Sequence, residues 1–312
     1  MNKSDALISI ISKALLDDDN DSWESSEYCV KRFSTNAFDS SYNCFKVVSK
    51  TELVLSGKLM PESFVVKKTD QWEYEVLSYL HQNSISVPET YIRLVNKRVP
   101  TSTTILLFEE FCEGKDIWEV DDVEPWKELG LQTAKFHNIF LNKRILKISD
   151  VTSKRIHGAQ IACSEDSRFR LTWIEAMNRL KNMPATLIHG DLFATNAVCT
   201  DRGVVIVDWA DSGDGAFAMD LGRFTATINQ KTSAPFCKYP NEFLESYYAG
   251  MQSVRPCDYS EFIKDVYAGQ FMEVASYYDP SVLREDIWDD ETVSFAVACR
   301  NKMEEIAKVL KA

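Results

Sequence analysis

The feature that most constrains the fold of this chain is a short β-rich segment, ATLIHGDLFATNAVCTDRGVVIVDWAD at residues 185–211, which lies within a long stretch of helical periodicity. Its apolar runs are typical of short buried strands, and the polar residues between them are typical of loops. Loops that are held by a rigid scaffold often carry functional side chains. The sequence therefore predicts that the chemistry of the molecule concentrates in this segment.

Helical periodicity surrounds the β-rich segment on both sides. Apolar residues recur three and four positions apart, as on the buried face of a helix, in the ranges 126–141, 166–182, 241–252, 259–278 and 290–311. The earlier part of the chain instead contains β-type runs, at 44–49, 52–57, 63–68 and 103–110, and one expected helix at 70–83 with Asp70 as its N-cap. An α+β fold is predicted, with a small antiparallel sheet lobe at 1–110, a hinge or linker at 111–116 and a larger, mainly helical lobe at 117–312.

Composition narrows the classes of partner. Acidic residues outnumber basic ones by 47 to 35, and the net charge of −12 disfavours binding to nucleic acid or to anionic membrane faces and favours cationic ligands. Solubility alone is an alternative reason for such acidity. No apolar run reaches the roughly 20 residues of a transmembrane helix, and the first residues do not have the pattern of a signal peptide. The eight scattered cysteines indicate neither a zinc site nor a disulfide framework, so a cytoplasmic protein is expected.

Two polar residues in the sequence HGDLFATN, Asp191 and Asn196, follow the first apolar run of the β-rich segment. Phosphoryl transfer needs a carboxylate that receives a hydroxyl proton and oxygen ligands that hold Mg²⁺, and kinases provide both with an Asp and an Asn at this spacing. A second apolar run, 204–207, ends at Asp208, where a kinase has its other magnesium-binding carboxylate. The pattern predicts Asp191 as the catalytic base and Asn196 and Asp208 as metal ligands.

These motifs resemble those of the aminoglycoside phosphotransferase and choline kinase family, whose members are protein-kinase-like small-molecule kinases. The resemblance rests on HGDLFATN, on Asp208-Trp209 and on Asp220-Leu221, and it extends in order over nearly the whole chain. It implies a two-lobe protein-kinase-like fold in which the helical lobe carries the catalytic loop and the acceptor pocket. It also implies Mg²⁺ as cofactor and ATP or GTP as phosphoryl donor.

The resemblance further implies a set of nucleotide-binding residues in the N-terminal lobe. Lys67 would contact the phosphates, Glu73 would pair with Lys67, and the backbone from Glu110 to Cys112 would hold the adenine. Side chains alternate along a strand, so only one of Lys67 and the adjacent Lys68 can point into the site. Lys67 is favoured because it follows FVV, and Glu75 remains an alternative to Glu73.

The other residues expected at or near the site are less clearly defined by the sequence. A phosphate-covering loop is expected within 38–43, with Ser41 and Asn43 as candidate contacts, although the segment contains no glycine. His189 and Asp220 are expected to be structural residues near the site. A late acidic group, Asp286, Asp289 and Asp290, would bind an amine-bearing acceptor or would form a favourable helix N-terminus.

The predicted function is a kinase that phosphorylates a hydroxyl of a small molecule, with an aminoglycoside-like or other cationic polyhydroxylated acceptor as the first candidate and antibiotic resistance as one role. A metabolic acceptor such as choline, homoserine or a sugar is the alternative. A catalytically inactive sensor with a kinase-like fold is a further hypothesis. A protein kinase is disfavoured, because the chain has neither a GxGxxG motif nor an activation-loop segment between Asp208 and Asp220. The sequence does not indicate an oligomeric state.

Overall fold

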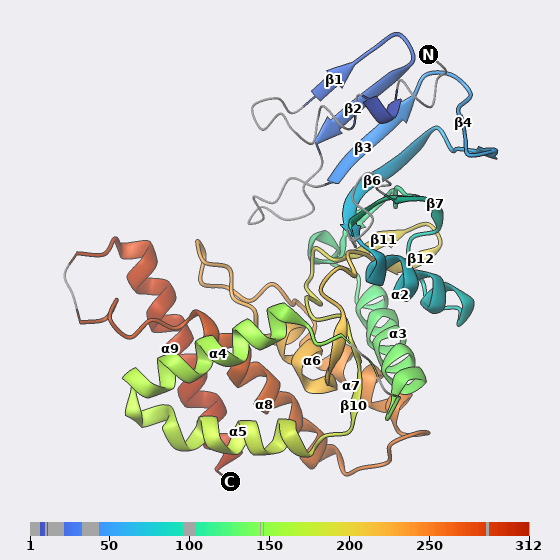
Figure 1. The fold of residues 1–312 in the computed structure, drawn as a ribbon. Helices are drawn as coiled ribbons and strands as arrows, with labels where there is room; N and C mark the ends of the chain where they lie inside the picture. The colour runs from blue at the N-terminus through green and yellow to red at the C-terminus, as the bar shows by residue number, and fades with distance from the viewer. Residues whose placement is uncertain are drawn as a thin grey trace. The chain divides into compact units, whose positions relative to one another are not determined.

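The computed structural model describes residues 7–9, 11, 22–32, 44–95, 104–143, 145, 147–284 and 287–311 (Figure 1). The chain divides into two compact units, of which the first comprises residues 1–114 and Val205–Ala210, and the second comprises Lys115–Val204 and Asp211–Ala312. The first division of the chain falls after Gly114, and the range predicted for the linker is 111–116. The assignment of Val205–Ala210 to the first unit was not apparent from the sequence.

The first unit contains a six-stranded antiparallel sheet with the order β1-β2-β3-β6-β8-β7. Its strands are β1 (Ser22–Glu24), β2 (Tyr28–Arg32), β3 (Cys44–Ser49), β6 (Ser63–Asp70), β7 (Thr90–Val95) and β8 (Thr104–Glu110), and β4 (Val54–Leu55) and β5 (Lys58–Leu59) form a separate ribbon. Burial alternates along β3, as expected for a strand with one face in a core. The register pairs Cys44 with Lys67 and Val65 with Glu109.

One helix, α2 (Gln71–Gln82), follows β6 directly. Asp70 ends the strand and caps the helix, because its carboxylate accepts a hydrogen bond from the Glu73 N–H at 3.1 Å. The buried face of α2 consists of Glu73, Val76, Leu77 and Leu80. An apolar core that includes Tyr28, Phe45, Phe64 and Phe108 supports the sheet of the same unit.

The second unit is mainly helical. Its helices are α3 (Glu124–Phe140), α4 (Asp150–Glu165), α5 (Arg170–Asn182), α6 (Phe217–Ala226), α7 (Pro240–Met251), α8 (Tyr259–Tyr277) and α9 (Asp290–Leu310), with short 3-10 turns at Ile117–Glu119 and Ser167–Phe169. Short strands accompany them, namely β9 (Lys115–Asp116), β10 (Ala185–Ile188), β11 (Ala197–Thr200) and β13 (Gly213–Ala216). A further strand, β12 (Gly203–Ile206), begins in this unit and ends in the first, because the division of the chain falls after Val204. β10 pairs with β13, and β11 pairs with β9. These two units confirm the α+β prediction.

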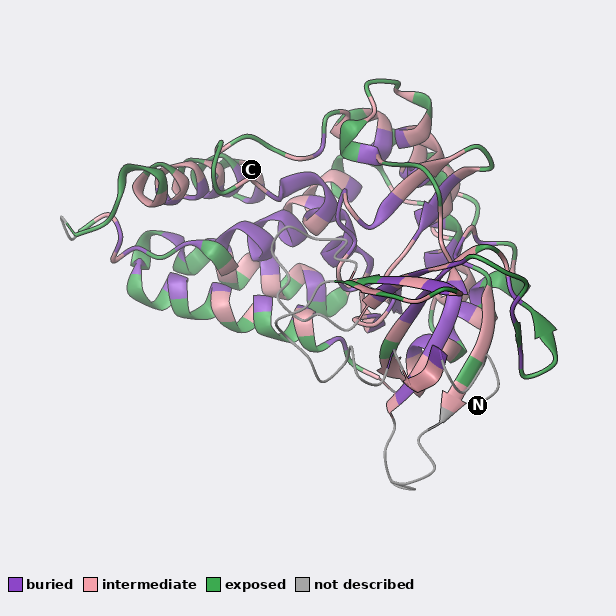
Figure 2. Cartoon of the chain, turned by 90° about the horizontal axis from the view of Figure 1, so that it is seen from above, coloured by how far each residue is buried: buried purple, intermediate pink, exposed green. Residues whose placement is uncertain are grey.

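Helices α6 and α8 cross at very short range, and glycines make the crossing possible. A Cβ atom on Gly269 would overlap the Ala218 carbonyl, and one on Gly222 would overlap the backbone of Gly269. Helix α8 is buried along most of its length, and Figure 2 shows other helices of this unit with buried residues on one side and exposed residues on the other. The close crossing brings the residues after Gly222 and Gly269 on the two helices near to each other.

Two of these helices, α4 and α6, are absent from the sequence prediction. The buried residues of α4 are Thr152, Arg155, Ala159, Ala162 and Cys163, a small and polar set that gives little apolar periodicity. Helix α6 is short and buried on nearly every side, so it has no contrast between an apolar and a polar face. Among the described residues, no helix combines the length and the apolar character that a membrane crossing requires.

Candidate active site

The loop after β10 is held by a buried carboxylate. Asp220, on α6, accepts hydrogen bonds from the His189 N–H at 2.6 Å and the Gly190 N–H at 2.9 Å. It also contacts Nε2 of His137, on α3, at 3.2 Å, and Nδ1 of that imidazole lies 2.9 Å from the Tyr247 hydroxyl. These contacts fix the backbone that precedes Asp191.

Gly190 is required at its position for two physical reasons. Its φ of +82° lies in the left-handed region, which side chains rarely adopt. A Cβ atom there would also overlap the Asp211 carbonyl and would lie 2.6 Å from the Ser149 hydroxyl oxygen. This explains why glycine stands where protein kinases have arginine in their H-R-D motif.

Two guanidinium groups hold the Asp191 carboxylate. Arg155, on α4, places Nη2 at 2.6 Å from Asp191 Oδ1, and its Nη1 donates to the Gly190 carbonyl at 2.5 Å. Arg223, on α6, reaches the same Oδ1 with Nε at 3.1 Å and Nη2 at 3.0 Å. Burial would raise the pKa of Asp191, but Arg223 and Arg155 outweigh burial, so the pKa lies below its ordinary value and the carboxylate is ionised.

Asn196 completes the loop and leaves one oxygen unsatisfied. Its Nδ2 donates to the Asp191 carbonyl at 2.9 Å and lies 3.3 Å from Asp191 Oδ2. Its Oδ1 is buried and has no hydrogen-bond partner among the described residues. A buried amide oxygen without a partner is costly unless something occupies it, and Mg²⁺ prefers such oxygen ligands. The side chain therefore fits the metal-ligand assignment.

The first unit contains an ion-paired cluster around Lys67. Its Nζ lies 2.7 Å from Glu73 Oε1 and also contacts Asp208 Oδ1. Burial alone would lower the pKa of Lys67, but Asp208 and Glu73 outweigh it and raise this pKa well above its usual value. Lys67 is thus a fixed cation.

The alternatives Lys68 and Glu75 lie elsewhere. Both side chains are exposed, and Glu75 instead accepts a hydrogen bond from Gln71 at 3.0 Å. Glu73 is fully buried, and its carboxylate accepts from the Thr69 hydroxyl at 2.5 Å and from the Trp209 N–H at 3.1 Å. The geometry of this unit therefore brings Lys67 and Glu73 together, and neither Lys68 nor Glu75 takes part in this ion pair.

Asp208 adopts an unusual backbone conformation. Its φ is +62°, in the left-handed region, which costs a non-glycine residue about 1–2 kcal/mol. The hydrogen bond from the next residue, Trp209, to Glu73 and the bond from the Trp209 indole to the Ile206 carbonyl, at 3.0 Å, hold this turn. Strain of this kind often marks a functional position.

Glu109 is a buried acid that sequence reasoning did not single out. It lies on β8 and is 8% exposed, and its side chain makes no hydrogen bond or ion pair among the residues that the structure describes. Burial, only partly opposed by the charge of Lys67, raises the pKa of Glu109 to about 8. The apolar pattern TILLF before it gave no signal that the next acid would be buried.

The other sequence-predicted contacts divide into three groups. The Glu110 N–H donates to the Glu89 carbonyl at 2.8 Å, so a contribution of Glu110 to a nucleotide would have to come from its carbonyl, and Cys112 follows β8. Asp289 caps α9, because its carboxylate accepts from the Thr292 N–H at 2.8 Å and hydroxyl at 2.9 Å, and Asp290 opens that helix. Ser41, Asn43 and Asp286 lie outside the described residues.

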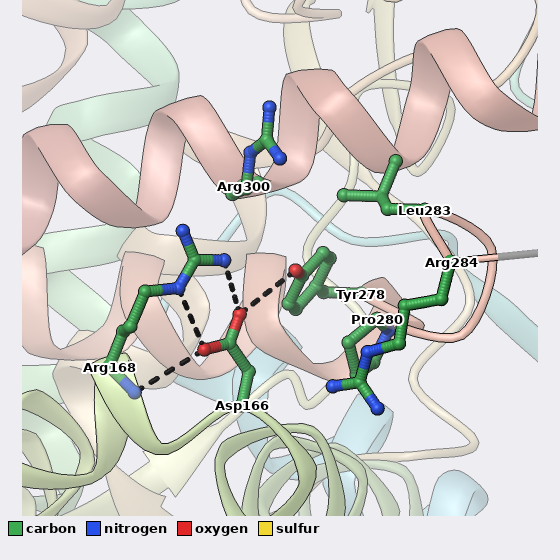
Figure 3. Close-up of a pocket in the computed structure, with 7 residues that line it drawn as sticks. All are labelled: Asp166, Arg168, Tyr278, Pro280, Leu283, Arg284 and Arg300. Atoms are coloured by element: carbon green, nitrogen blue, oxygen red, sulfur yellow. Dashed lines mark hydrogen bonds and ion pairs between the residues drawn. The ribbon is translucent and has the colours of Figure 1, made fainter.

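A pocket elsewhere in the second unit does not coincide with this site. Its lining is Asp166, Arg168, Tyr278, Pro280, Leu283, Arg284 and Arg300. Figure 3 shows that the guanidinium groups of Arg168, Arg284 and Arg300 point in different directions, and that Arg168 is paired with Asp166. None of the predicted site residues lines it, so this pocket is separate from the predicted site.

Comparisons with known proteins agree with the geometry. A model of the phosphotransferase enzyme family matches residues 45–257, which is more than half of the chain. No curated protein matches the sequence.

Solved structures share the fold at low sequence identity. Choline kinase LicA from Streptococcus pneumoniae is 12% identical with a TM-score of 0.57, over 97% of this chain and 99% of that one. The amicoumacin kinase hAmiN, solved in complex with AMP-PNP, Ca²⁺ and Ami, is 15% identical with a TM-score of 0.56, over 98% of this chain and 96% of that one. Spectinomycin phosphotransferase APH(9)-Ia is 13% identical with a TM-score of 0.53, over 100% of this chain and 98% of that one. These similarities confirm the predicted protein-kinase-like fold.

Proposed function

The chain belongs to the phosphotransferase enzyme family, and from this premise we propose that it transfers the γ-phosphoryl group of ATP or GTP to a hydroxyl of a small molecule. The observation that carries the proposal is the state of the HGDLFATN loop: the Asp191 carboxylate is ionised, and the Asn196 Oδ1 beside it is buried without a partner. An ionised carboxylate and an orphaned amide oxygen are what acceptor alignment and metal binding require.

Asp191 is the proposed base. Its Oδ1 is occupied by the two guanidinium groups, so Oδ2 is the oxygen that would accept a hydrogen bond from the acceptor hydroxyl. With its pKa lowered, Asp191 is a weak base, so we assign it chiefly to orienting the hydroxyl. The hydroxyl proton would pass to Oδ2 as the new P–O bond forms and as the bond from the γ-phosphorus to the bridging oxygen breaks, which releases the nucleoside diphosphate. A loose phosphoryl-transfer transition state needs little proton removal beforehand, which suits this arrangement.

Asn196 and Asp208 are the proposed ligands for Mg²⁺. Both offer hard oxygen atoms, and the orphaned Asn196 Oδ1 is the observation that supports the fit. Bound Mg²⁺ would neutralise charge on the phosphate oxygens of the donor. Lys67, held by Glu73, is the proposed cation for the donor phosphates, and the backbone of Glu110 and Cys112 is the proposed contact for the base.

The acceptor is proposed to be a polyhydroxylated small molecule, with an amine-bearing compound as the first candidate because the net charge is −12. The immediate surroundings of Asp191 do not add to that preference. Asp191 and Glu273 are balanced there by Arg155 and Arg223, so this cluster has no net negative charge. A neutral polyol is therefore retained as the second candidate.

The test is coupled nucleotide turnover with purified protein and Mg²⁺. ATP and GTP are each offered with aminoglycosides, other antibiotics, choline-like amines, amino-alcohols and sugars. Stimulation of turnover by one class, with a phosphorylated product detected by mass spectrometry, supports the proposal and identifies the acceptor. Nucleotide binding without transfer to any acceptor would favour a sensor, and failure to bind either nucleotide would contradict the proposal.

A further inference from the structure

The arrangement around Asp191 is asymmetric. Within the described part of the chain, the contacts of its carboxylate with arginine go to Oδ1, whereas the contact of Oδ2 is the one with Asn196 Nδ2 at 3.3 Å. A carboxylate held on one oxygen by two guanidinium groups from two helices cannot rotate about its Cα–Cβ bond without breaking several charge-assisted hydrogen bonds. The contacts therefore select one rotamer and one accessible oxygen.

A third helix holds the two arginines. Glu273, on α8, is 1% exposed, and its Oε2 lies 3.1 Å from Arg155 Nε while its Oε1 lies 2.5 Å from Arg223 Nη1. The Thr227 hydroxyl donates to the same Oε1 at 2.9 Å, and the Tyr277 hydroxyl accepts from Arg223 Nη1 at 2.7 Å. Glu273 thus joins α4, α6 and α8 behind the catalytic carboxylate.

The backbone explains why these groups meet. Arg223 directly follows Gly222, and Glu273 lies one helical turn after Gly269, so the close crossing of α6 and α8 brings the guanidinium and the carboxylate together. Arg223 also stacks on Phe193 of the catalytic loop, with Cζ 4.7 Å from the ring centroid.

Stability alone does not account for the cluster. Replacing a buried ion-pair network by apolar residues of similar volume is often neutral or stabilising, because desolvation offsets the attraction between the charges. What the network supplies, and an apolar core could not, is a single orientation for the Asp191 carboxylate.

We propose that Arg155 and Arg223 are positioning residues that hold Asp191 with Oδ2 presented to the acceptor hydroxyl, and that Glu273 acts through them by holding both guanidinium groups. The inference rests on the proposed function, because it assumes that Asp191 is the residue that meets the acceptor. It assigns a role in the reaction to three residues outside the HGDLFATN motif. Misplacement of a reacting group by about 1 Å can cost roughly 10²-fold in rate, which sets the size of the expected effect.

The kinetic test compares Arg223→Gln and Arg223→Lys with wild type and with a matched control. Arg223→Gln is expected to lower kcat by about 10- to 100-fold with the KM for the nucleotide changed less than about twofold, because alignment is lost and donor binding is not. Arg223→Lys, which keeps the charge, and guanidinium added to Arg223→Gln are each expected to restore part of kcat. The control is Arg179→Gln, which removes an arginine that pairs with Asp265 and Glu261 between α5 and α8, away from Asp191.

Glu273→Gln tests the second half of the proposal. It leaves the shape of the side chain and removes the charge that holds both arginines, and a similar loss of kcat with little change in nucleotide KM is expected. Unchanged kcat in Arg223→Gln and Glu273→Gln, or a loss equal to that of Arg179→Gln, would overturn the proposal. If Asp191→Asn were fully active, the proposed function would fail instead, so the two failures are distinguishable.

A crystal structure provides a readout that needs no activity. In Arg223→Gln the Asp191 carboxylate is expected to rotate or to occupy two conformers, whereas it stays in one conformer in the wild type and in Arg179→Gln. A single unchanged Asp191 conformer in Arg223→Gln would overturn the positioning role, whatever the acceptor proves to be.

Discussion

At the scale of single residues, the site depends on backbone conformations that sequence patterns do not record. Gly190 and Asp208 both have positive φ values, +82° and +62°. For Gly190 the residue type agrees with the conformation, whereas Asp208 adopts it at a cost and is held by the contacts of Trp209. The motif therefore predicted which side chains form the site, but the strain at Asp208 could only be found from the structure.

Gly190→Ala is expected to destabilise the protein by about 2–4 kcal/mol, of which about 1 kcal/mol comes from the left-handed backbone and the rest from overlap with Asp211 and Ser149. Gly57→Ala is the matched control, since Gly57 has a similar φ of +79° with no atom within 4 Å of the added Cβ. Urea unfolding measures the loss of stability in each of the two variants. Equal losses for the two variants would mean that the space around Gly190 does not matter.

Glu109 predicts an unusual pH dependence of stability. Its pKa is raised from 4.5 to about 8 on folding, so between these values the unfolded chain has lost a proton that the folded protein keeps. The contribution of Glu109 to the free energy of unfolding is therefore present below pH 4.5 and is lost as the pH rises toward 8. Glu109→Gln removes this titration. As the pH rises from 5 to 8, the free energy of unfolding of the variant is therefore expected to increase by at least about 1 kcal/mol relative to that of the wild type.

Urea unfolding of both proteins at the two pH values measures this difference. Glu52→Gln, at an exposed position on the same unit, serves as the control and should follow the wild type. A constant difference between Glu109→Gln and wild type across the window would show that Glu109 does not titrate there.

At the scale of elements, the sequence predicted helices and strands that have a clear apolar periodicity, and it missed two helices that have none. The strands at β3, β6 and β8 and the helices α2, α3, α5, α7, α8 and α9 coincide with predicted ranges, because each has one apolar face or one short apolar run. Helices α4 and α6 lack such contrast. They carry Arg155 and Arg223, so the residues that hold Asp191 were missed together with their helices.

Two members of the late acidic group, Asp289 and Asp290, lie at the start of α9. Asp289→Ala is expected to lower the stability more than Asp290→Ala, because the Asp289 carboxylate accepts two hydrogen bonds from Thr292. Asp290→Ala removes only a favourable charge in the first turn and should cost a few tenths of a kcal/mol. Thermal unfolding compares the two variants, and equal losses, or a raised KM for the acceptor with unchanged stability, would contradict the capping role of Asp289.

At the scale of the whole molecule, two units supply different parts of the proposed reaction. The first contains the Lys67, Glu73 and Asp208 cluster, and the second contains Asp191, Asn196 and the arginines that contact Asp191. The protein-kinase-like fold and the phosphotransferase family followed from the motifs, because these chemical requirements allow few substitutions. The acceptor did not follow, because specificity depends on the shape of a pocket built from segments far apart in sequence.

The central claim is tested most directly by the turnover of Asp191→Asn with the acceptor that the panel identifies. The variant is expected to lower kcat by on the order of 10² to 10⁴ while it remains folded and still binds nucleotide, because alignment of the hydroxyl and its proton acceptor are both lost. Asp201→Asn, an exposed aspartate in the turn between β11 and β12, is the control and should retain wild-type turnover. Wild-type turnover in Asp191→Asn would contradict the account.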